Sequence, residues 1–345
     1  MDKLSRRRFI QLAAGTAGMA AVGSDFARAQ GQLTIGGYGG DVQKYLSELV
    51  FKYSLEPKGI SPVLEAALDD QRKLKLLAER KLPRGTYDVV YLHGPNLNEM
   101  NEQGVFDQIE TSRIPLYQEL PADLQKSYAI PHIATYRVIV YNPQHVSDVP
   151  TTMEDLWNSK YANRIGLVDG NYGLAISCAA LINGGNMTDY EPGKEKLLEL
   201  KKLGARVYPS NEAFAQALQT GECWVGVSIQ SRGIMWKQAG VPIDIAYPRE
   251  GVVREWWGFA IPKNARNKDD AYEFINATLA DHAQMGWAEK MFAHAQRKGL
   301  TQRLDPAIAK RFEMPADAKI IAVDEKYWTE NSRQLKDWWD RVFKA

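Results

Sequence analysis

Short apolar segments rich in β-branched residues alternate with amphipathic segments along most of this chain. The strand-like segments are residues 33–35, 87–91, 136–141, 164–168 and 224–229, and the helix-like segments are residues 41–53, 71–80, 211–220 and 268–279. Such alternation is typical of an α/β architecture with mainly parallel sheets. In open parallel sheets, ligands bind beyond the carboxyl ends of the strands, beside helix N-termini. We therefore expect an α/β fold whose binding residues lie in the loops that follow its strands.

The first 29 residues are expected to form an export signal rather than part of this fold. Residues 5–11 (Ser-Arg-Arg-Arg-Phe-Ile-Gln) have the twin-arginine form that the bacterial Tat pathway reads. Residues 9–22 are weakly apolar but too short to span a membrane, which takes about 20 mainly apolar residues. Ala27-Arg28-Ala29 is a small-x-small cleavage site and predicts Gln30 as the mature start. This pattern predicts a Tat-exported periplasmic protein.

Length and charge then bound the mature chain. Without residues 1–29, the 43 basic and 42 acidic residues fall to 38 and 40, a net charge of −2. This balance indicates no surface for nucleic acid or anionic lipid. About 315 residues exceed the usual size of one core, so we expect two lobes. Lobe 1 is predicted to comprise residues 30–137 plus 257–305, and lobe 2 residues 138–256 plus 306–345, with crossings at 136–141 and 255–262.

No signature of catalysis or cofactor binding stands out. The chain has no Gly-x-Ser-x-Gly elbow, no Gly-x-x-x-x-Gly-Lys loop and no His-Glu-x-x-His helix. In the glycine-rich run at 36–40, Val42 stands where a dinucleotide fingerprint needs its third glycine. The five histidines lack the paired spacing of a metal site. We expect no enzyme, cofactor or metal, and a Tat-exported periplasmic enzyme is the rival class. Cys178 and Cys223 fit either a disulfide or two buried thiols.

Four stretches in order resemble one family. They are residues 87–90 (Tyr-Asp-Val-Val), 153–157 (Met-Glu-Asp-Leu-Trp), 237–244 (Lys-Gln-Ala-Gly-Val-Pro-Ile-Asp) and the block at 247–262 that ends in Phe-Ala-Ile-Pro. Over essentially the whole mature chain, the sequence is similar to type II periplasmic solute-binding proteins of the spermidine/putrescine receptor cluster. The resemblance implies a central sheet in each of two lobes, joined by a two-strand hinge. It also implies a monomer that closes on a small-molecule ligand and delivers it to the permease subunits of an ABC importer.

The resemblance also indicates which residues bind the ligand. In polyamine receptors, the strand before the Ala-Ile-Pro block presents a Trp and, two residues later, an Asp. Here these positions are Glu255 and Trp257, which share one face of the strand and suit an ammonium group. Arg232 stands where polyamine receptors carry uncharged residues, and its planar fork suits a carboxylate or phosphonate. The pair is similar to that of γ-aminobutyrate receptors, so we expect a zwitterion such as γ-aminobutyrate or 2-aminoethylphosphonate.

Three further residues, Tyr38, His93 and Tyr172, follow strand-like segments and are predicted to face the cleft. Each of the six candidates has a plainer interpretation. Arg232 and Glu255 can pair with each other, or Arg254 can pair with Glu255, and the aromatic residues can serve the core or simple turns. The C-terminal tryptophans are expected to pack the tail onto the lobes.

Two other receptor types remain alternatives within the binding class. A polyamine receptor is the first, and Arg232 argues against it because an arginine repels a polycation. A ferric-ion receptor is the second. Its adjacent tyrosine pair is missing, and residues 136–138 around Arg137 match its anion-binding arginine only superficially.

Overall fold

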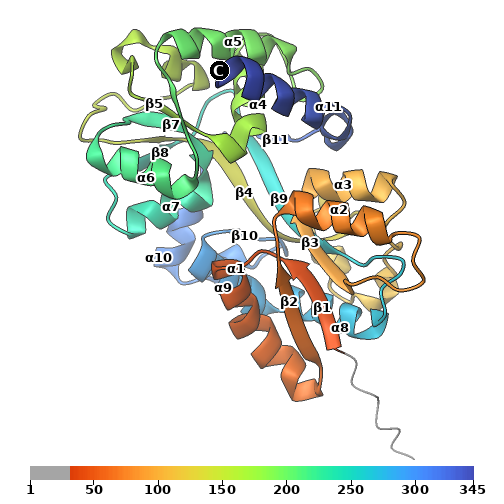
Figure 1. Cartoon of the computed structure of the whole chain (residues 1–345). Coiled ribbons are helices and arrows are strands. Elements are labelled where there is room, and N and C mark those ends of the chain that lie inside the picture. The colour runs from red at the N-terminus through yellow and green to blue at the C-terminus, as the bar shows by residue number, and fades with distance from the viewer. Residues whose placement is uncertain (1–31) are drawn as a thin grey trace, which may run out of the picture. The chain divides into compact units, whose positions relative to one another are not determined.

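The structure is a computed structural model that describes residues 32–345, so the predicted export signal and its cleavage site lie outside the described residues. The described part is a mixed α/β protein with two lobes (Figure 1). The first lobe contains β1 (Gln32–Gly37), α1 (Asp41–Leu46), β2 (Ser61–Ala66), α2 (Asp69–Glu79), β3 (Val89–His93), α3 (Gly94–Glu102), α8 (Lys268–Leu279) and α9 (Asp281–Met291).

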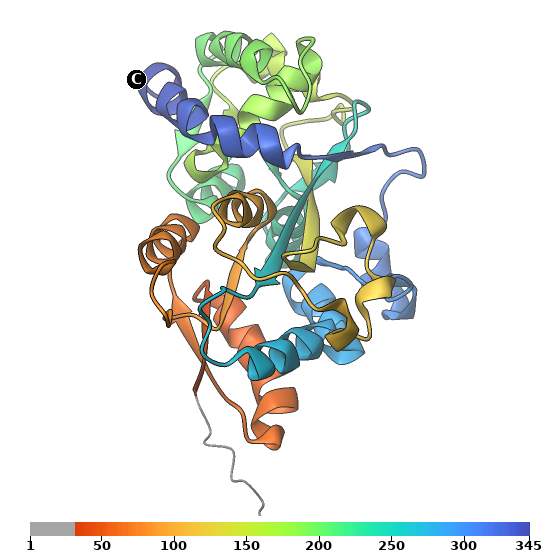
Figure 2. The ribbon, with the colours of Figure 1, turned by 90° about the vertical axis from the view of Figure 1, so that its right-hand side faces the viewer.

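The second lobe contains β5 (Ile165–Val168), α4 (Tyr172–Ile182), α5 (Glu191–Lys202), β6 (Arg206–Tyr208), α6 (Asn211–Thr220), β7 (Val225–Ile229), α7 (Gln230–Gln238), β8 (Asp244–Ala246) and α11 (Glu325–Trp338). Two long strands, β4 (Ile130–Tyr141) and β9 (Val252–Ala260), run between the lobes (Figure 2). The remaining strands and α-helix of the described residues are short: β10 (His294–Ala295), α10 (Pro306–Ala309) and β11 (Ile320–Ala322). Short 3-10 and π-helical segments, such as Ser47–Leu55 after α1, join these elements.

The strand β4 joins the sheets of the two lobes. Its first part, from Ile130 to Tyr136, pairs with β9, and its last part, from Arg137 to Tyr141, pairs with β7 and β8. The outer strands are parallel: β1 with β2 and β3, and β5 with β6 and β7. The prediction of mainly parallel sheets is wrong at the centre. There β4 runs antiparallel to β9, because these two hinge strands cross between the lobes in opposite directions, and it is also antiparallel to β7 and β8.

Each lobe has its own hydrophobic core. One cluster gathers around Ile35, Phe274 and Trp287, and another around Leu156 and Trp339. Since Trp339 is fully buried in the second cluster and Trp328 and Trp338 pack against it, the predicted packing of the C-terminal tryptophans is confirmed. Near the end of the chain, Phe312 packs with Ala288 of α9. The lobe boundaries drawn from the sequence stay predictions.

Helix α3 follows β3 without an intervening loop. Strand β3 ends at His93 and α3 begins at Gly94. Proline suits the first turn of a helix, because it lacks the N–H that the helix would leave unpaired there, and Pro95 occupies that turn. Gly94 is packed so closely against the ring of Trp256 that a side chain would not fit.

The two cysteines are separate buried thiols and form no disulfide. Burial raises the pKa of Cys178 to about 11 and that of Cys223 to about 12. Both thiols are therefore protonated at neutral pH. Within residues 32–345, no helix has the length and apolar character needed to cross a bilayer.

Candidate functional site

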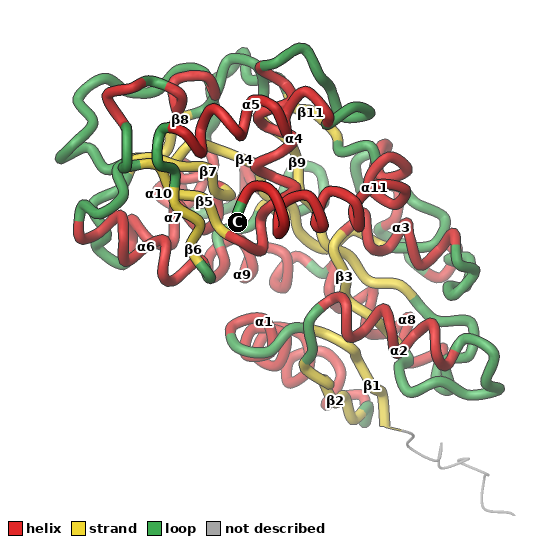
Figure 3. Tube along the Cα trace, turned by 45° about the horizontal axis from the view of Figure 1, so that its top comes forward, coloured by secondary structure: helices red, strands yellow, loops and turns green. Residues whose placement is uncertain are grey.

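A cleft of about 1090 Å³ is lined by both lobes and by the hinge strands. It extends from α7 to α11, which lie on the left and the right of the second lobe in Figures 1 and 3. The cleft brings together all six residues that the sequence predicted, which are Tyr38, His93, Tyr172, Arg232, Glu255 and Trp257. Their contact with a ligand stays a prediction.

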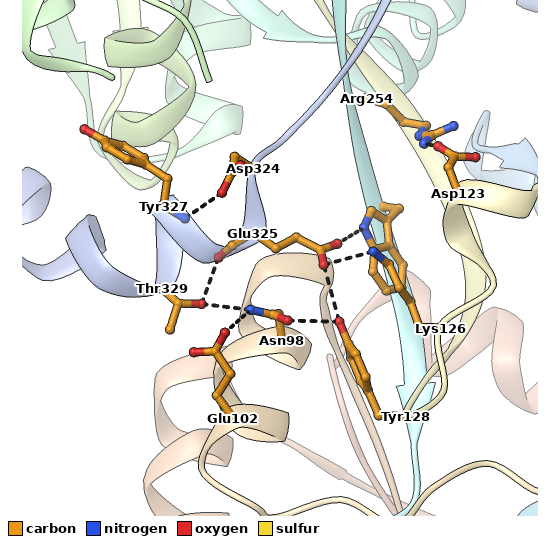
Figure 4. A network of polar contacts seen from close by, with 11 residues as sticks. Asn98, Glu102, Asp123, Lys126, Tyr128, Arg254, Asp324, Glu325, Tyr327 and Thr329 are labelled. Carbon is orange, nitrogen blue, oxygen red and sulfur yellow. Dashed lines mark hydrogen bonds and ion pairs between the residues drawn. The ribbon is translucent and has the colours of Figure 1, made fainter. Parts of the chain in front are cut away.

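Glu255 lies on β9 in the floor of the cleft and is only 5 % exposed. Its carboxylate accepts hydrogen bonds from the guanidinium of Arg137 and from Nε2 of His93. Burial by itself would raise the pKa of Glu255, but Arg137 and His93 outweigh burial and lower this pKa to about 2. The expected alternative partner, Arg254, pairs with Asp123 instead (Figure 4). Glu255 is therefore ionised and already has partners within the protein.

Arg137 is a cleft residue that the sequence reasoning set aside. It lies on β4, is 3 % exposed, and donates to the hydroxyl of Ser177 on α4 as well as to Glu255. Burial alone would lower the pKa of Arg137, whereas the charge of Glu255 raises it. The signal was present in the sequence, because Arg137 interrupts a β-branched run that otherwise reads as a buried strand. A charge at such a position needs a buried partner.

Asp69 is the second residue that the sequence reasoning missed. It opens α2, and its carboxylate accepts from the Tyr38 hydroxyl, the Arg72 guanidinium, the His93 backbone N–H at 3.2 Å and Asn96 Nδ2 at 2.6 Å. Burial and the charge of Asp69 raise the pKa of Tyr38 well above its usual value. The only hint in the sequence was an acidic pair at the start of a helix, which more often stabilises the helix dipole.

Arg72 completes this wall of the cleft from below. It is fully buried and lies beneath the ring of Tyr38, 4.2 Å from the ring centroid. Its guanidinium also donates to the carbonyl oxygens of Gly37 and Ala67. Two carboxylates on this side, Asp69 and Glu255, therefore have buried arginines as counterions.

Arg232 differs from these arginines. It lies in the first turn of α7, is half-buried, and its guanidinium contacts the sulfur of Met235 at 3.6 Å. No carboxylate of residues 32–345 lies within ion-pair distance of it, so the pairing of Arg232 with Glu255 that the sequence left open does not occur. The start of α7 is tied to β4, because the Ser231 N–H donates to Thr135 Oγ1 at 3.1 Å.

Aromatic side chains form the rest of the cleft surface. Trp257 is partly buried, and its ring centroid lies 4.9 Å from that of His93. On the second lobe, Tyr172 stacks on Trp328 at 5.8 Å. Within the described range no group of His, Cys, Asp and Glu is arranged to hold a metal ion. The side chains of the cleft are therefore suited to bind charged and apolar groups of a ligand.

The family model of bacterial extracellular solute-binding proteins matches residues 63–316, well over half of the chain. The chain belongs to this family. Among curated relatives, this solute-binding protein is 28 % identical over 247 residues to the spermidine/putrescine-binding periplasmic protein of Escherichia coli, which covers 69 % of the chain and 71 % of the relative. The Salmonella typhimurium protein of that name is 27 % identical over 251 residues, 70 % of the chain and 72 % of the relative.

Solved structures share the fold of this solute-binding protein at lower identity. A GABA receptor superposes with a TM-score of 0.80 at 20 % identity, over 91 % of this chain and 98 % of its own. The spermidine/putrescine-binding PotD of Streptococcus pneumoniae gives 0.73 at 20 % identity, over 91 % and 99 %. The predicted two-lobed type II fold and receptor cluster are thus confirmed. The protein is a periplasmic solute-binding protein of an ABC transporter and not an enzyme.

Proposed function

We propose that the protein captures a small zwitterionic amine, of the γ-aminobutyrate or 2-aminoethylphosphonate type, for an ABC importer. The observation that carries this proposal is Arg232, a half-buried cation in the cleft with no carboxylate partner among the described residues. A cation in that setting gains most from a ligand that brings its own acid group. The carboxylate or phosphonate of the ligand is therefore assigned to Arg232.

The ammonium group is assigned to Glu255 and Trp257. Arg137 contacts Glu255 through Oε1, and His93 through Oε2. A carboxylate has about four acceptor positions, so Oε2 retains one for an ammonium group. Trp257, two residues along β9, offers a ring face to the same cation. Tyr38, His93 and Tyr172 are proposed as further ligand contacts among the residues that line the cleft.

A polyamine is the second candidate ligand, because several relatives are named as spermidine/putrescine-binding proteins. A polyamine needs a carboxylate for each ammonium once water is excluded. The two least exposed carboxylates of this cleft, Asp69 and Glu255, already neutralise buried arginines, and Arg232 would repel the ligand. The charges therefore favour a zwitterion.

The deciding measurement is the thermal unfolding of protein that has been unfolded and refolded to remove bound ligand. A true ligand at about 100 times its dissociation constant adds about 2.7 kcal/mol of stability. We expect γ-aminobutyrate or 2-aminoethylphosphonate to raise the unfolding temperature and putrescine to leave it unchanged. Stabilisation by putrescine or spermidine alone would contradict the proposal.

Replacement of the arginine tests the anion site directly. Arg232→Ala is expected to weaken zwitterion binding about a hundredfold, because a buried charge-assisted bond is lost. Arg341→Ala is the matched control, since Arg341 is an exposed arginine that does not line the cleft. Calorimetry of both variants gives the comparison. Equal affinity of wild type and Arg232→Ala would remove Arg232 from the site.

Export and delivery complete the proposal. Residues 5–11 predict Tat export with cleavage after Ala29, and replacement of Arg6 and Arg7 by lysine is expected to retain the precursor in the cytoplasm. Cell fractionation measures this, and unchanged export would point to another route. The closed, monomeric receptor is then proposed to pass its ligand to the permease subunits of the transporter.

A further inference from the structure

Helix α11 closes the end of the cleft that lies away from Arg232. Five of its residues line the cleft: Trp328, Ser332, Arg333, Lys336 and Asp337. The helix begins at Glu325, beyond residue 316 where the family match ends. The match to the family model therefore does not extend to this helix.

The first turn of α11 is fastened to the first lobe (Figure 4). The Glu325 carboxylate, 14 % exposed, accepts from three donors: Lys126 Nζ at 3.1 Å, the Tyr128 hydroxyl at 3.3 Å and Trp256 Nε1 at 3.1 Å. One turn later, Thr329 Oγ1 accepts from Asn98 Nδ2 of α3 at 3.3 Å. A network of this kind, with a buried carboxylate at its centre, holds a helix end in a single position.

The other end of α11 is fastened to the second lobe. Leu335 and Trp339 are buried in the core of that lobe, and Trp339 Nε1 donates to Asp169 Oδ1 at 2.8 Å. Figure 2 shows the helix, in dark blue, between the green helices of the second lobe and the orange helices of the first. Because both lobes hold it, α11 bridges them at this end of the cleft.

Trp328 is the part of α11 that fills the cleft. Its ring stacks on Tyr172 at an angle of 28° and lies so close to Gly173 that a side chain there would not fit. The Tyr172 hydroxyl in turn donates to the Ser332 carbonyl at 3.5 Å. The ring is thus held on two sides, and a ligand cannot displace it without breaking these contacts.

We propose that α11 is the end wall of the cleft, that Trp328 sets the longest ligand the cleft accepts, and that Glu325 is the positioning residue that holds this wall. The inference rests on the proposed function for the direction of the ligand. With the acid group on Arg232 and the ammonium group assigned to Glu255, a chain too long to end at Glu255 extends toward α11, and each added methylene then brings its far end closer to Trp328. Ligands longer than the wall allows are excluded by overlap.

The test is a length series measured by calorimetry on the wild type and on Trp328→Ala. The probes are γ-aminobutyrate, δ-aminovalerate and ε-aminocaproate, with putrescine, cadaverine and spermidine as a parallel series. In Trp328→Ala the affinity for the longest probe relative to the shortest is expected to rise about tenfold or more. The ratio is taken within one variant, so partial unfolding does not affect it.

Trp338→Ala is the matched control. It removes the same ring from the same helix, but Trp338 packs on Phe343 and does not line the cleft. We expect its length ratio to equal that of the wild type. An unchanged ratio in Trp328→Ala, or an equal change in Trp338→Ala, would overturn the inference.

The two series also separate this inference from the proposed function. If only diamines bind, the zwitterion proposal fails, while the rise in the diamine length ratio still tests the wall. If no probe binds, hydrogen exchange of residues 170–176 in the ligand-free protein decides. We expect faster exchange of these residues in Trp328→Ala than in the wild type, and no change in Trp338→Ala. Equal exchange in Trp328→Ala and the wild type would contradict the inference that Trp328 holds this end of the cleft.

The role of Glu325 is tested by comparing Glu325→Gln, Trp328→Ala and the variant that carries both substitutions. Glu325→Gln keeps the shape of the side chain but removes its charge, and we expect it to shift the length ratio in the same direction as Trp328→Ala by a smaller factor. In the double variant the two effects should not add, because both act on one wall. Additive effects, or a loss of stability with no change of length ratio, would reduce Glu325 to a purely structural residue.

Discussion

On the wall formed by the first lobe and the hinge strands, the carboxylates of Asp69 and Glu255 each contact a buried arginine and at least one further donor. On the wall formed by the second lobe, Arg232 contacts only a methionine sulfur among the polar and charged partners in the described residues. Both walls face the same cleft. They differ in whether their charges are satisfied within the protein.

This difference indicates that the two walls have different roles in ligand binding. The first wall is preorganised, because its donors and acceptors already fix the positions of Tyr38 and His93. The second wall has a charge whose best partner comes from outside. Under the proposed function, a ligand that bridges the walls supplies an interaction that the protein alone lacks, and we propose this interaction as the physical cause of lobe closure.

The largest expected effect on the free energy of unfolding follows from removal of Arg137, the counterion of Glu255 on the first wall. Arg137→Met should lower the free energy of unfolding by about 3–5 kcal/mol, because it leaves Glu255 charged and buried without its counterion. Urea unfolding at neutral pH measures the loss. Glu255→Leu combined with Arg137→Met should recover most of it. A loss below about 1 kcal/mol in the single variant would mean that the pair is not buried as a unit.

Low pH should reduce the stabilising contribution of Glu255 on the same wall to the free energy of unfolding. The pKa of Glu255 is lowered in the folded protein from 4.5 to about 2, so its stabilising contribution is fully present above pH 4.5 and is lost as the pH falls toward 2. The contribution is on the order of 3 kcal/mol. Urea midpoints across this range should fall more steeply for the wild type than for Glu255→Gln. Parallel curves would show that Glu255 has an ordinary pKa.

A smaller effect is expected at Asp69. Asp69→Asn should cost about 2 kcal/mol, because Arg72 loses its counterion and the amide cannot accept from all four donors. Asp70→Asn is the matched control. Its side chain is 89 % exposed and should change stability by less than about 0.5 kcal/mol. Equal losses at both positions would contradict a special role for Asp69.

The smallest effect is expected on the second wall. Arg232→Met should change the free energy of unfolding by less than about 0.5 kcal/mol in the absence of ligand, because no ion pair among the described residues is broken. The same urea titration used for Arg137→Met measures it. A loss of more than about 2 kcal/mol would reveal that Arg232 supports the fold, and the contrast between the walls would disappear.

Elements with local signals could be predicted closely. Helix α6 begins and ends as expected at Asn211 and Thr220, because Ser210 caps its N-terminus and Gly221, with φ of 73°, ends it. Helix α8 also has its expected bounds, with Asn267 as its cap. The family motifs correctly indicated the two-lobed fold, and the six candidate residues all line one cleft.

The partners of the cleft residues could not be predicted in this way. Glu255 and Arg137 are 118 residues apart, and His93 and Glu255 are 162 apart. The sequence suggested Arg232 or Arg254 as partners of Glu255, and both suggestions are wrong because β4 brings Arg137 beside it instead. Sequence proximity says little about pairs that meet only across a sheet.

The sequence by itself therefore determined the alternation of strands and helices, the lobes, the family and the residue types that face the cleft. These follow from local propensity, from capping and from the order of motifs along the chain. Only the tertiary structure decided which charges are satisfied and which are not, and that α11 closes one end of the cleft. Those facts depend on side chains from distant segments, whose mutual approach is set by packing of the two cores rather than by any local pattern.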